Sequence, residues 1–264
     1  MMFGETPFLE RFAAASRAGF TAVEFLLPYA WDKRDLADRL ARHQLTQVLH
    51  NLPAGDWDRG DRGLACLPDR RGEFQDSVGL GIEYATALEC SRLNCLVGIA
   101  PPGMPREVLT ATLVENLRFA APRLAEAGIG LLVEPINGRD MPGYFLNRLT
   151  DAAHILEQAA VDNLFLQADL YHMHMMGEDV PSVLARHLPR IRHVQIADCP
   201  GRHEPGTGTI DFDGLFTQLE AGGYEGWIGC EYRPATTTEA GLGWLARYRS
   251  GTLPRDVREE EPRR

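Results

Sequence analysis

Short apolar runs alternate along the chain with longer amphipathic stretches, and this alternation constrains the fold more than any other feature. Repeated strand-helix units place their strands parallel in one sheet. The expected strands are residues 21–27, 45–51, 93–98, 129–134, 164–169, 191–197 and 227–231. The expected helices include residues 8–18, 35–42, 73–88, 106–126, 150–160 and 212–222.

Two α/β architectures accommodate this order: an open doubly wound sheet and a (β/α)8 barrel. No GxGxxG follows the first expected strand, so the dinucleotide-binding form of the open sheet lacks its fingerprint. The chain of 264 residues matches a TIM barrel of about 250 residues, and no linker divides it. We predict a single α/β barrel domain over residues 1–250, with a charged, disordered tail at 251–264.

Bulk charge and cysteine usage narrow the class of protein. A formal net charge of −10 disfavours nucleic acid and anionic membranes as partners. Five cysteines without a CxxC pair argue against a disulfide framework and favour a reducing cytoplasm. No apolar stretch is long enough for a membrane span or a signal peptide. We therefore expect a cytoplasmic protein whose partner is a small molecule, and a homo-oligomer stays open.

Polar residues end four successive apolar runs. Glu134 ends IGLLVE, Asp169 ends LFLQAD, Gln195 lies in HVQIAD and Glu231 ends WIGCE. Any one acid could merely cap a helix, but four at equivalent positions would converge at the carboxyl face of a barrel. Three convergent carboxylates would repel one another unless a cation were present. An all-oxygen set predicts one divalent metal, Mg²⁺ or Mn²⁺.

Several long strings in the chain are characteristic of one family. They include GFTAVEFLLPY, LHNLPAGDWDRGDRGLACLPDR, LVEPIN, DLYHM, HVQIAD, HEPGTGTIDF and WIGCEYRP. Over residues 3–248 the chain resembles the hydroxypyruvate isomerases, within the xylose-isomerase-like barrels. The resemblance implies that Glu134 and Glu231 are the catalytic proton donor and acceptor. It also implies that Glu134, Asp169, Gln195 and Glu231 hold the metal.

Four further residues are candidates for substrate binding. His172 matches a substrate-facing histidine of related sugar epimerases, although a surface or capping histidine is the plain alternative. His50 ends the run LTQVLHN at the same mouth, where it could equally be structural. Arg202, in the loop GRHEPGTG, is a candidate for gripping a substrate carboxylate, and Glu204 for orienting that grip. The alternative for Arg202 is a solvated loop residue.

The expected reaction interconverts hydroxypyruvate and 2-hydroxy-3-oxopropanoate (tartronate semialdehyde) through an enediolate. One glutamate removes a proton from carbon and the other returns one to the neighbouring carbon. The nearest alternatives are a 2-oxo-tetronate isomerase and a ketose epimerase of the same barrel group. From other classes, an endonuclease-type metal phosphodiesterase and a non-catalytic sugar-binding barrel stay open. The former needs a basic face and a histidine-rich metal cluster, which the composition disfavours.

The start of the chain carries a separate expectation. In the family it resembles, a strand precedes the segment that matches MFGETPFLERF, whereas here Met1 stands directly before that segment. We therefore expect a barrel that lacks its first strand. The strands at residues 21–27 and 227–231 should then border a gap and not pair with each other.

Overall fold

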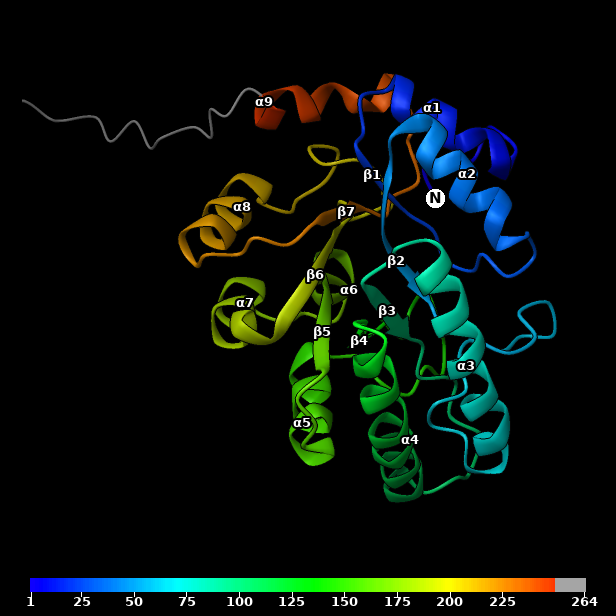
Figure 1. Ribbon diagram of the computed structural model, residues 1–264. Helices are drawn as coiled ribbons and strands as arrows, with labels where there is room; N and C mark the ends of the chain where they lie inside the picture. Colours follow the sequence, from blue (N-terminus) through cyan, green and yellow to red (C-terminus); the bar gives the residue numbers. More distant parts are fainter. Residues whose placement is uncertain (250–264) are drawn as a thin grey trace, which may run out of the picture.

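Seven parallel strands form one curved sheet in the computed structural model, which describes residues 1–249 (Figure 1). Each strand pairs with the next one along the chain, in the order β1-β2-β3-β4-β5-β6-β7. The strands are β1 (Ala22–Glu24), β2 (Thr46–Asn51), β3 (Arg92–Cys95), β4 (Gly130–Val133), β5 (Leu164–Asp169), β6 (Ile191–Ile196) and β7 (Ile228–Cys230). The predicted α/β barrel and its seven strands are confirmed.

Helices line the outer side of the sheet (Figure 1). They are α1 (Arg11–Arg17), α2 (Lys33–His43), α3 (Arg71–Ala87), α4 (Arg106–Glu126), α5 (Leu149–Ala159), α6 (Leu170–Met175), α7 (Val180–His187), α8 (Phe212–Ala221) and α9 (Ala246–Arg249). Short 3₁₀ turns lie at Phe8–Glu10, Pro68–Arg70, Leu188–Arg190 and Ala240–Leu245. None of the helices within residues 1–249 combines the length and the apolar character needed to cross a membrane.

The core between helices and sheet follows from helical spacing. In α4, Leu109, Leu113, Leu117 and Leu124 are spaced four to seven residues apart and are fully buried. This stripe faces the sheet, where strands such as β4 contribute only apolar side chains. Burial of such apolar stripes holds the helices against the outer face of the sheet. The inner face of the sheet is then free to carry polar side chains.

Polar side chains occupy the inner face near the carboxyl ends of the strands. Successive strand residues point to opposite faces, so Gln167 and Asp169 of β5 share one face, as do His193 and Gln195 of β6. All four are buried. The register aligns Asp169 with Gln195, which brings the two strand ends to the same level. The fold thus gathers polar groups where a barrel carries its active site.

The sheet does not close through its backbone within residues 1–249. β1 pairs only with β2, and β7 only with β6, so the two edge strands are not hydrogen-bonded to each other. The expected gap between them is confirmed. A cavity of about 880 Å³ opens here, lined by both edge strands and by His50, Glu134 and Glu231. The tail predicted at 251–264 lies outside the described residues.

Candidate active site at the carboxyl ends of the strands

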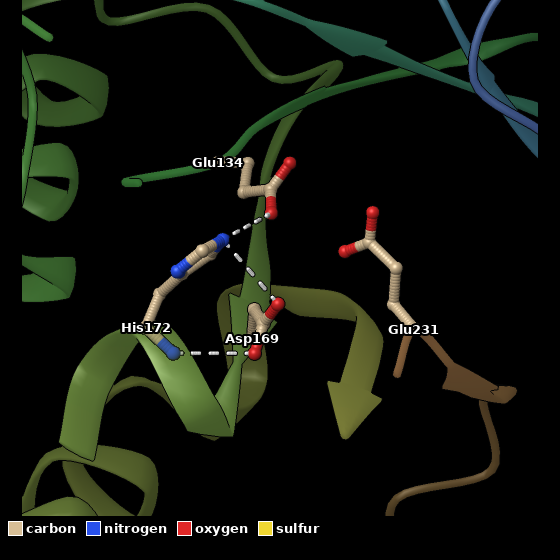
Figure 2. A group of neighbouring side chains, drawn as sticks. All are labelled: Glu134, Asp169, His172 and Glu231. Carbon is tan, nitrogen blue, oxygen red and sulfur yellow. Dashed lines mark hydrogen bonds and ion pairs between the residues drawn. The ribbon is translucent and has the colours of Figure 1, made fainter. Parts of the chain in front are cut away.

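Glu134 follows β4 directly and points into the barrel. Its Oε2 accepts a hydrogen bond of 3.0 Å from Nδ2 of Asn94 on β3, and Asn94 also donates to Oδ1 of Asn51 at the end of β2. All three side chains are buried. Three neighbouring strand ends therefore hold the Glu134 carboxyl group in place, while its Oε1 lies 3.9 Å from Nε2 of His172 (Figure 2).

Asp169 ends β5 and caps α6. Its Oδ1 accepts hydrogen bonds from the backbone N–H groups of Tyr171 and His172, at 2.8 and 3.3 Å. Its Oδ2 is buried and has no hydrogen-bond partner in the described part of the chain. The nearest nitrogens, Nη2 of Arg202 and Nε2 of His172, lie 3.6 Å from this oxygen, so it remains able to accept a ligand bond.

Glu231 follows β7 and completes an acidic cluster, which we define as Glu134, Asp169, His172 and Glu231. One atom from each of these four side chains lies within 4.8 Å of every other (Figure 2). The Nε2 of His172 is 3.9 Å from Oε1 of Glu134 and 3.6 Å from Oδ2 of Asp169. The sequence predicted that acids at the strand ends converge, and Glu134, Asp169 and Glu231 do lie together.

The cluster raises the pKa of its own carboxyl groups. Burial, together with the charges of Glu231 and Asp169, raises the pKa of Glu134 well above its usual range. Burial is also the main cause of the raised pKa of Asp169 and of Glu231. Arg202 opposes all three shifts without cancelling them. A divalent cation bound among these oxygens would remove the repulsion, so the donor set fits such an ion.

Gln195 lies beside the acidic cluster on β6. Its Oε1 accepts a 2.5 Å hydrogen bond from Nε2 of Gln167, and its Nε2 donates to Oε1 of Glu24 at 2.9 Å. Both neighbours orient the amide so that its oxygen points away from Glu24. The role of Gln195 as a metal ligand stays a prediction.

Arg202 belongs to the loop after β6, and its side chain lies in the site. Its Nη2 donates to Oε2 of Glu231 at 3.1 Å and lies 3.6 Å from Oδ2 of Asp169. Its Nη1 is 3.7 Å from Oδ2 of Asp140. Burial alone would lower the pKa of Arg202, but the surrounding carboxylates raise it on balance. With a side chain only 15% exposed, Arg202 is not a solvated loop residue.

Glu204 lies in the same loop as Arg202 and contacts a different segment. Its Oε2 accepts a hydrogen bond from the backbone N–H of Ala235, and no hydrogen bond or ion pair joins it to Arg202 in the described residues. The carboxylate also packs against Gly241, where an added Cβ would lie 2.9 Å from Oε1. The loop turns Glu204 toward the segment after β7, and its role in orienting the grip of Arg202 on a substrate stays a prediction.

His50 is the second-to-last residue of β2, and it lines the cavity. Its side chain is buried, and neither ring nitrogen has a hydrogen-bond partner in the described residues. Burial lowers the pKa of His50 to about 3, so the ring is neutral near pH 7. Phe25 stacks beside it with ring centroids 6.3 Å apart. Two unsatisfied nitrogens that line a cavity next to Glu134 suit a ligand with hydroxyl or carbonyl oxygens.

Sequence reasoning missed three supporting residues. Asn94 holds Glu134, Glu24 contacts Gln195, and Asn137 lies 2.6 Å from Nδ1 of His172. Glu24 and Asn94 are polar residues inside apolar runs, TAVEFLL and LNCLVG, and this was the available signal. Asn137 carried no such signal, because only the folded loop after β4 brings it to His172.

Comparison with known proteins agrees with this geometry. The sequence profile described as "Xylose isomerase-like TIM barrel" matches residues 12–248. A protein of Escherichia coli K12 named hydroxypyruvate isomerase is 49% identical over 249 residues, which cover 94% of this chain and 96% of that protein. A Cupriavidus necator protein named 2-oxo-tetronate isomerase is 47% identical over 248 residues, 94% of this chain and 95% of that protein.

A solved structure extends the likeness to three dimensions. The crystal structure of a Brucella melitensis protein named AP endonuclease, family 2, superposes with a TM-score of 0.91 and 46% sequence identity. The match covers 94% of this chain and 95% of that one. The resemblance seen in the sequence motifs is thereby confirmed over nearly the whole chain. This chain belongs to the xylose isomerase-like TIM barrel family, together with proteins named hydroxypyruvate isomerase and 2-oxo-tetronate isomerase.

Proposed function

We propose that this chain is an isomerase that interconverts hydroxypyruvate and 2-hydroxy-3-oxopropanoate. The observation that carries the proposal is the pair formed by buried Glu134 and partly buried Glu231, whose pKa values are both raised in one acidic cluster. Moving a carbonyl to the adjacent carbon requires one group that takes a proton and another that returns one. A carboxyl group with a raised pKa serves both purposes near neutral pH.

One divalent cation, Mg²⁺ or Mn²⁺, is part of the proposal. Glu134, Asp169, Glu231 and the Gln195 amide oxygen are the proposed ligands, and the unpartnered Oδ2 of Asp169 supports this set. When bound, such an ion would polarise the oxygens of the substrate and make its C–H bond more acidic. The side chains of Asn94 and Gln167 would keep the ligand oxygens in position.

The proton transfers are assigned to the two glutamates. One carboxylate takes the proton from the carbon that bears the hydroxyl group, which leaves an enediolate. The other, protonated at the outset because its pKa is raised, donates to the neighbouring carbon, and the hydroxyl proton passes to the former carbonyl oxygen. Arg202 is the proposed partner of the substrate carboxylate, since its Nη2 lies 3.1 Å from Glu231 and 3.6 Å from Asp169. Neutral His50 and His172 are proposed to bind substrate oxygens.

The relatives support a small oxo acid as the substrate and, together with the negative net charge, disfavour nucleic acid. Since all five cysteines are free, a reducing cytoplasm is the proposed location. A four-carbon 2-oxo-tetronate is the second candidate substrate, because the Cupriavidus necator relative, 47% identical, is named 2-oxo-tetronate isomerase.

The decisive experiment compares substrates with one enzyme preparation saturated with Mn²⁺. Turnover of hydroxypyruvate, a 2-oxo-tetronate and a ketohexose is measured beside cleavage of a DNA duplex with an abasic site, the reaction that the name of the Brucella relative suggests. We expect the highest kcat/KM with hydroxypyruvate and exchange of its C–H proton in D2O. A higher value with the tetronate would transfer the proposal to that substrate. DNA cleavage without isomerisation would refute it.

A further inference from the structure

The amide of Asn137 has only one orientation that satisfies its neighbours. Its Oδ1 accepts hydrogen bonds from the backbone N–H groups of Arg139 and Asp140, at 3.0 and 2.8 Å. Turning the amide over would point its NH₂ group at these two donors. Because hydrogen-bond networks assign amide orientation, Nδ2 must be the atom that faces His172.

Nδ1 of His172 is therefore an acceptor. Nδ2 of Asn137 lies 2.6 Å from it and can only donate. Both side chains are buried, so no shift toward solvent relieves this contact. A neutral imidazole with a bare Nδ1 carries its proton on Nε2, the nitrogen that faces Glu134 and Asp169.

One contact favours the opposite tautomer. Nη2 of Arg202 lies 3.4 Å from Nε2 of His172 and would need a bare nitrogen there to donate to. That distance is long for a hydrogen bond, and the same Nη2 already donates to Glu231 at 3.1 Å. The 2.6 Å contact with Asn137 and the carboxylate oxygens around Nε2 both place the proton on Nε2. They outweigh the Arg202 contact.

We propose that Asn137 is a positioning residue that locks His172 as the Nε2–H tautomer. His172 then enters the acidic cluster as a hydrogen-bond donor and not as a metal ligand, although its Nε2 is within ligand range of the three acids. Resting on the proposed function, the donor would bind a substrate oxygen on which negative charge develops during proton transfer. Metal coordination would be left to oxygen atoms alone.

Long-range ¹H–¹⁵N spectra of the histidine rings test the tautomer directly in metal-free protein. The eight histidines are resolved by uniform labelling, and a His172→Gln variant identifies the signals of His172. We expect Nδ1 to resonate as a bare nitrogen and Nε2 as a protonated one. The pattern should persist after saturation with diamagnetic Mg²⁺. A bare Nε2 in either state would overturn the proposal.

An isosteric variant tests the part played by Asn137. Asn137→Asp keeps an oxygen for the two backbone donors but replaces the NH₂ group with an acceptor, so the Nδ1 signal should become that of a protonated nitrogen. Asn147→Asp is the matched control, because Nδ2 of Asn147 donates to the backbone oxygen of Ile136 in the same loop. It should leave the His172 signals unchanged. An unchanged pattern in Asn137→Asp would refute the assignment.

Activity separates this inference from the proposed function. Asn137→Asp should lower kcat/KM by about 10–100-fold, as is typical of residues that orient active-site groups. Circular dichroism and the melting temperature verify that the variant folds. If the wild type lacked isomerase activity but showed the predicted tautomer, the function would fail while the tautomer assignment stood. If the wild type showed isomerase activity but not the predicted tautomer, only the role assigned to Asn137 would be refuted.

Discussion

Replacing Glu134 with glutamine should change stability in opposite directions with and without metal. In metal-free protein, burial and two neighbouring acids raise the pKa of Glu134, so its charge above neutral pH opposes folding. Glutamine has the same shape without that charge, and its Oε1 can still accept the hydrogen bond from Asn94. The metal-free variant should therefore be more stable than the wild type at pH 8.

The size of each effect follows from linkage. Each pKa unit of elevation corresponds to about 1.4 kcal/mol, or roughly 3–6 °C in melting temperature for a domain of this size. A cation at one hundred times its dissociation constant stabilises the wild type by about 2.7 kcal/mol, or roughly 5–11 °C. Glu134→Gln loses one anionic ligand, so it should gain much less from the same Mn²⁺ concentration.

Differential scanning fluorimetry at pH 8, with EDTA and then with a Mn²⁺ titration, follows both effects. The two melting curves should cross: the variant melts higher in EDTA and lower in saturating Mn²⁺. Glu157→Gln is the matched control, since Glu157 is an exposed acid that pairs with the exposed His154. A Glu134→Gln protein that melts lower than the wild type in EDTA would refute the argument from buried charge.

Three further outcomes are expected. Glu231→Gln should lower kcat by at least about 10²-fold at saturating Mn²⁺, and a kcat near that of the wild type would remove Glu231 from the mechanism. Arg202→Ala should raise KM for hydroxypyruvate by at least about tenfold and for a neutral ketohexose much less, since a charged hydrogen bond contributes about 1.5–3 kcal/mol. The third concerns pH. The pKa values of Glu134, Asp169 and Glu231 are higher in the folded, metal-free protein than in the unfolded chain. These groups therefore stabilise the fold at a pH below their unfolded-state pKa values, and this stabilisation is lost as the pH rises through their folded-state pKa values. The gain in melting temperature on adding Mn²⁺ should thus grow between pH 5 and 8, and a constant gain would contradict the shifts.

The hydrophobic pattern predicted the strands because each is a local feature of the chain. The expected edge strands at 21–27 and 227–231 are shorter in the structure, where β1 is Ala22–Glu24 and β7 is Ile228–Cys230. Each of these has a pairing partner on one side only, so fewer residues meet the pairing pattern of a strand.

Helices α6 and α7 were not predicted, although their signals are present. Asp169 caps α6 and Asp179 caps α7, and Pro181 stands in the first turn of α7. The stretch between β5 and β6 is broken by Gly177, so neither piece is long enough to show a clear helical period. Short helices depend on caps and tertiary contacts more than on periodicity.

The acids of the site were predictable because strand ends meet at one face of a barrel. The side chains around them were not, because loop conformation decides their direction. Arg202 adopts a left-handed backbone conformation with φ of 58° and enters the site, whereas Glu204, two residues later, turns away. No pattern in GRHEPGTG distinguishes these two outcomes.

Glu24 explains how the site stays ordered beside an unpaired seam. Its carboxylate reaches from β1 across to β6, where Oε2 lies 2.5 Å from Nε2 of His193 and Oε1 accepts from Gln195. On the way it passes Gly229 of β7, where an added Cβ would lie 2.4 Å from Oε1. Glycine thus leaves the space through which an edge-strand side chain joins β6. The backbone does not connect β1 with β7 in the described residues, but these side-chain hydrogen bonds do connect β1 with β6. Because Gln195 is one end of that bridge, the orientation of a proposed metal ligand depends on the closure of the barrel.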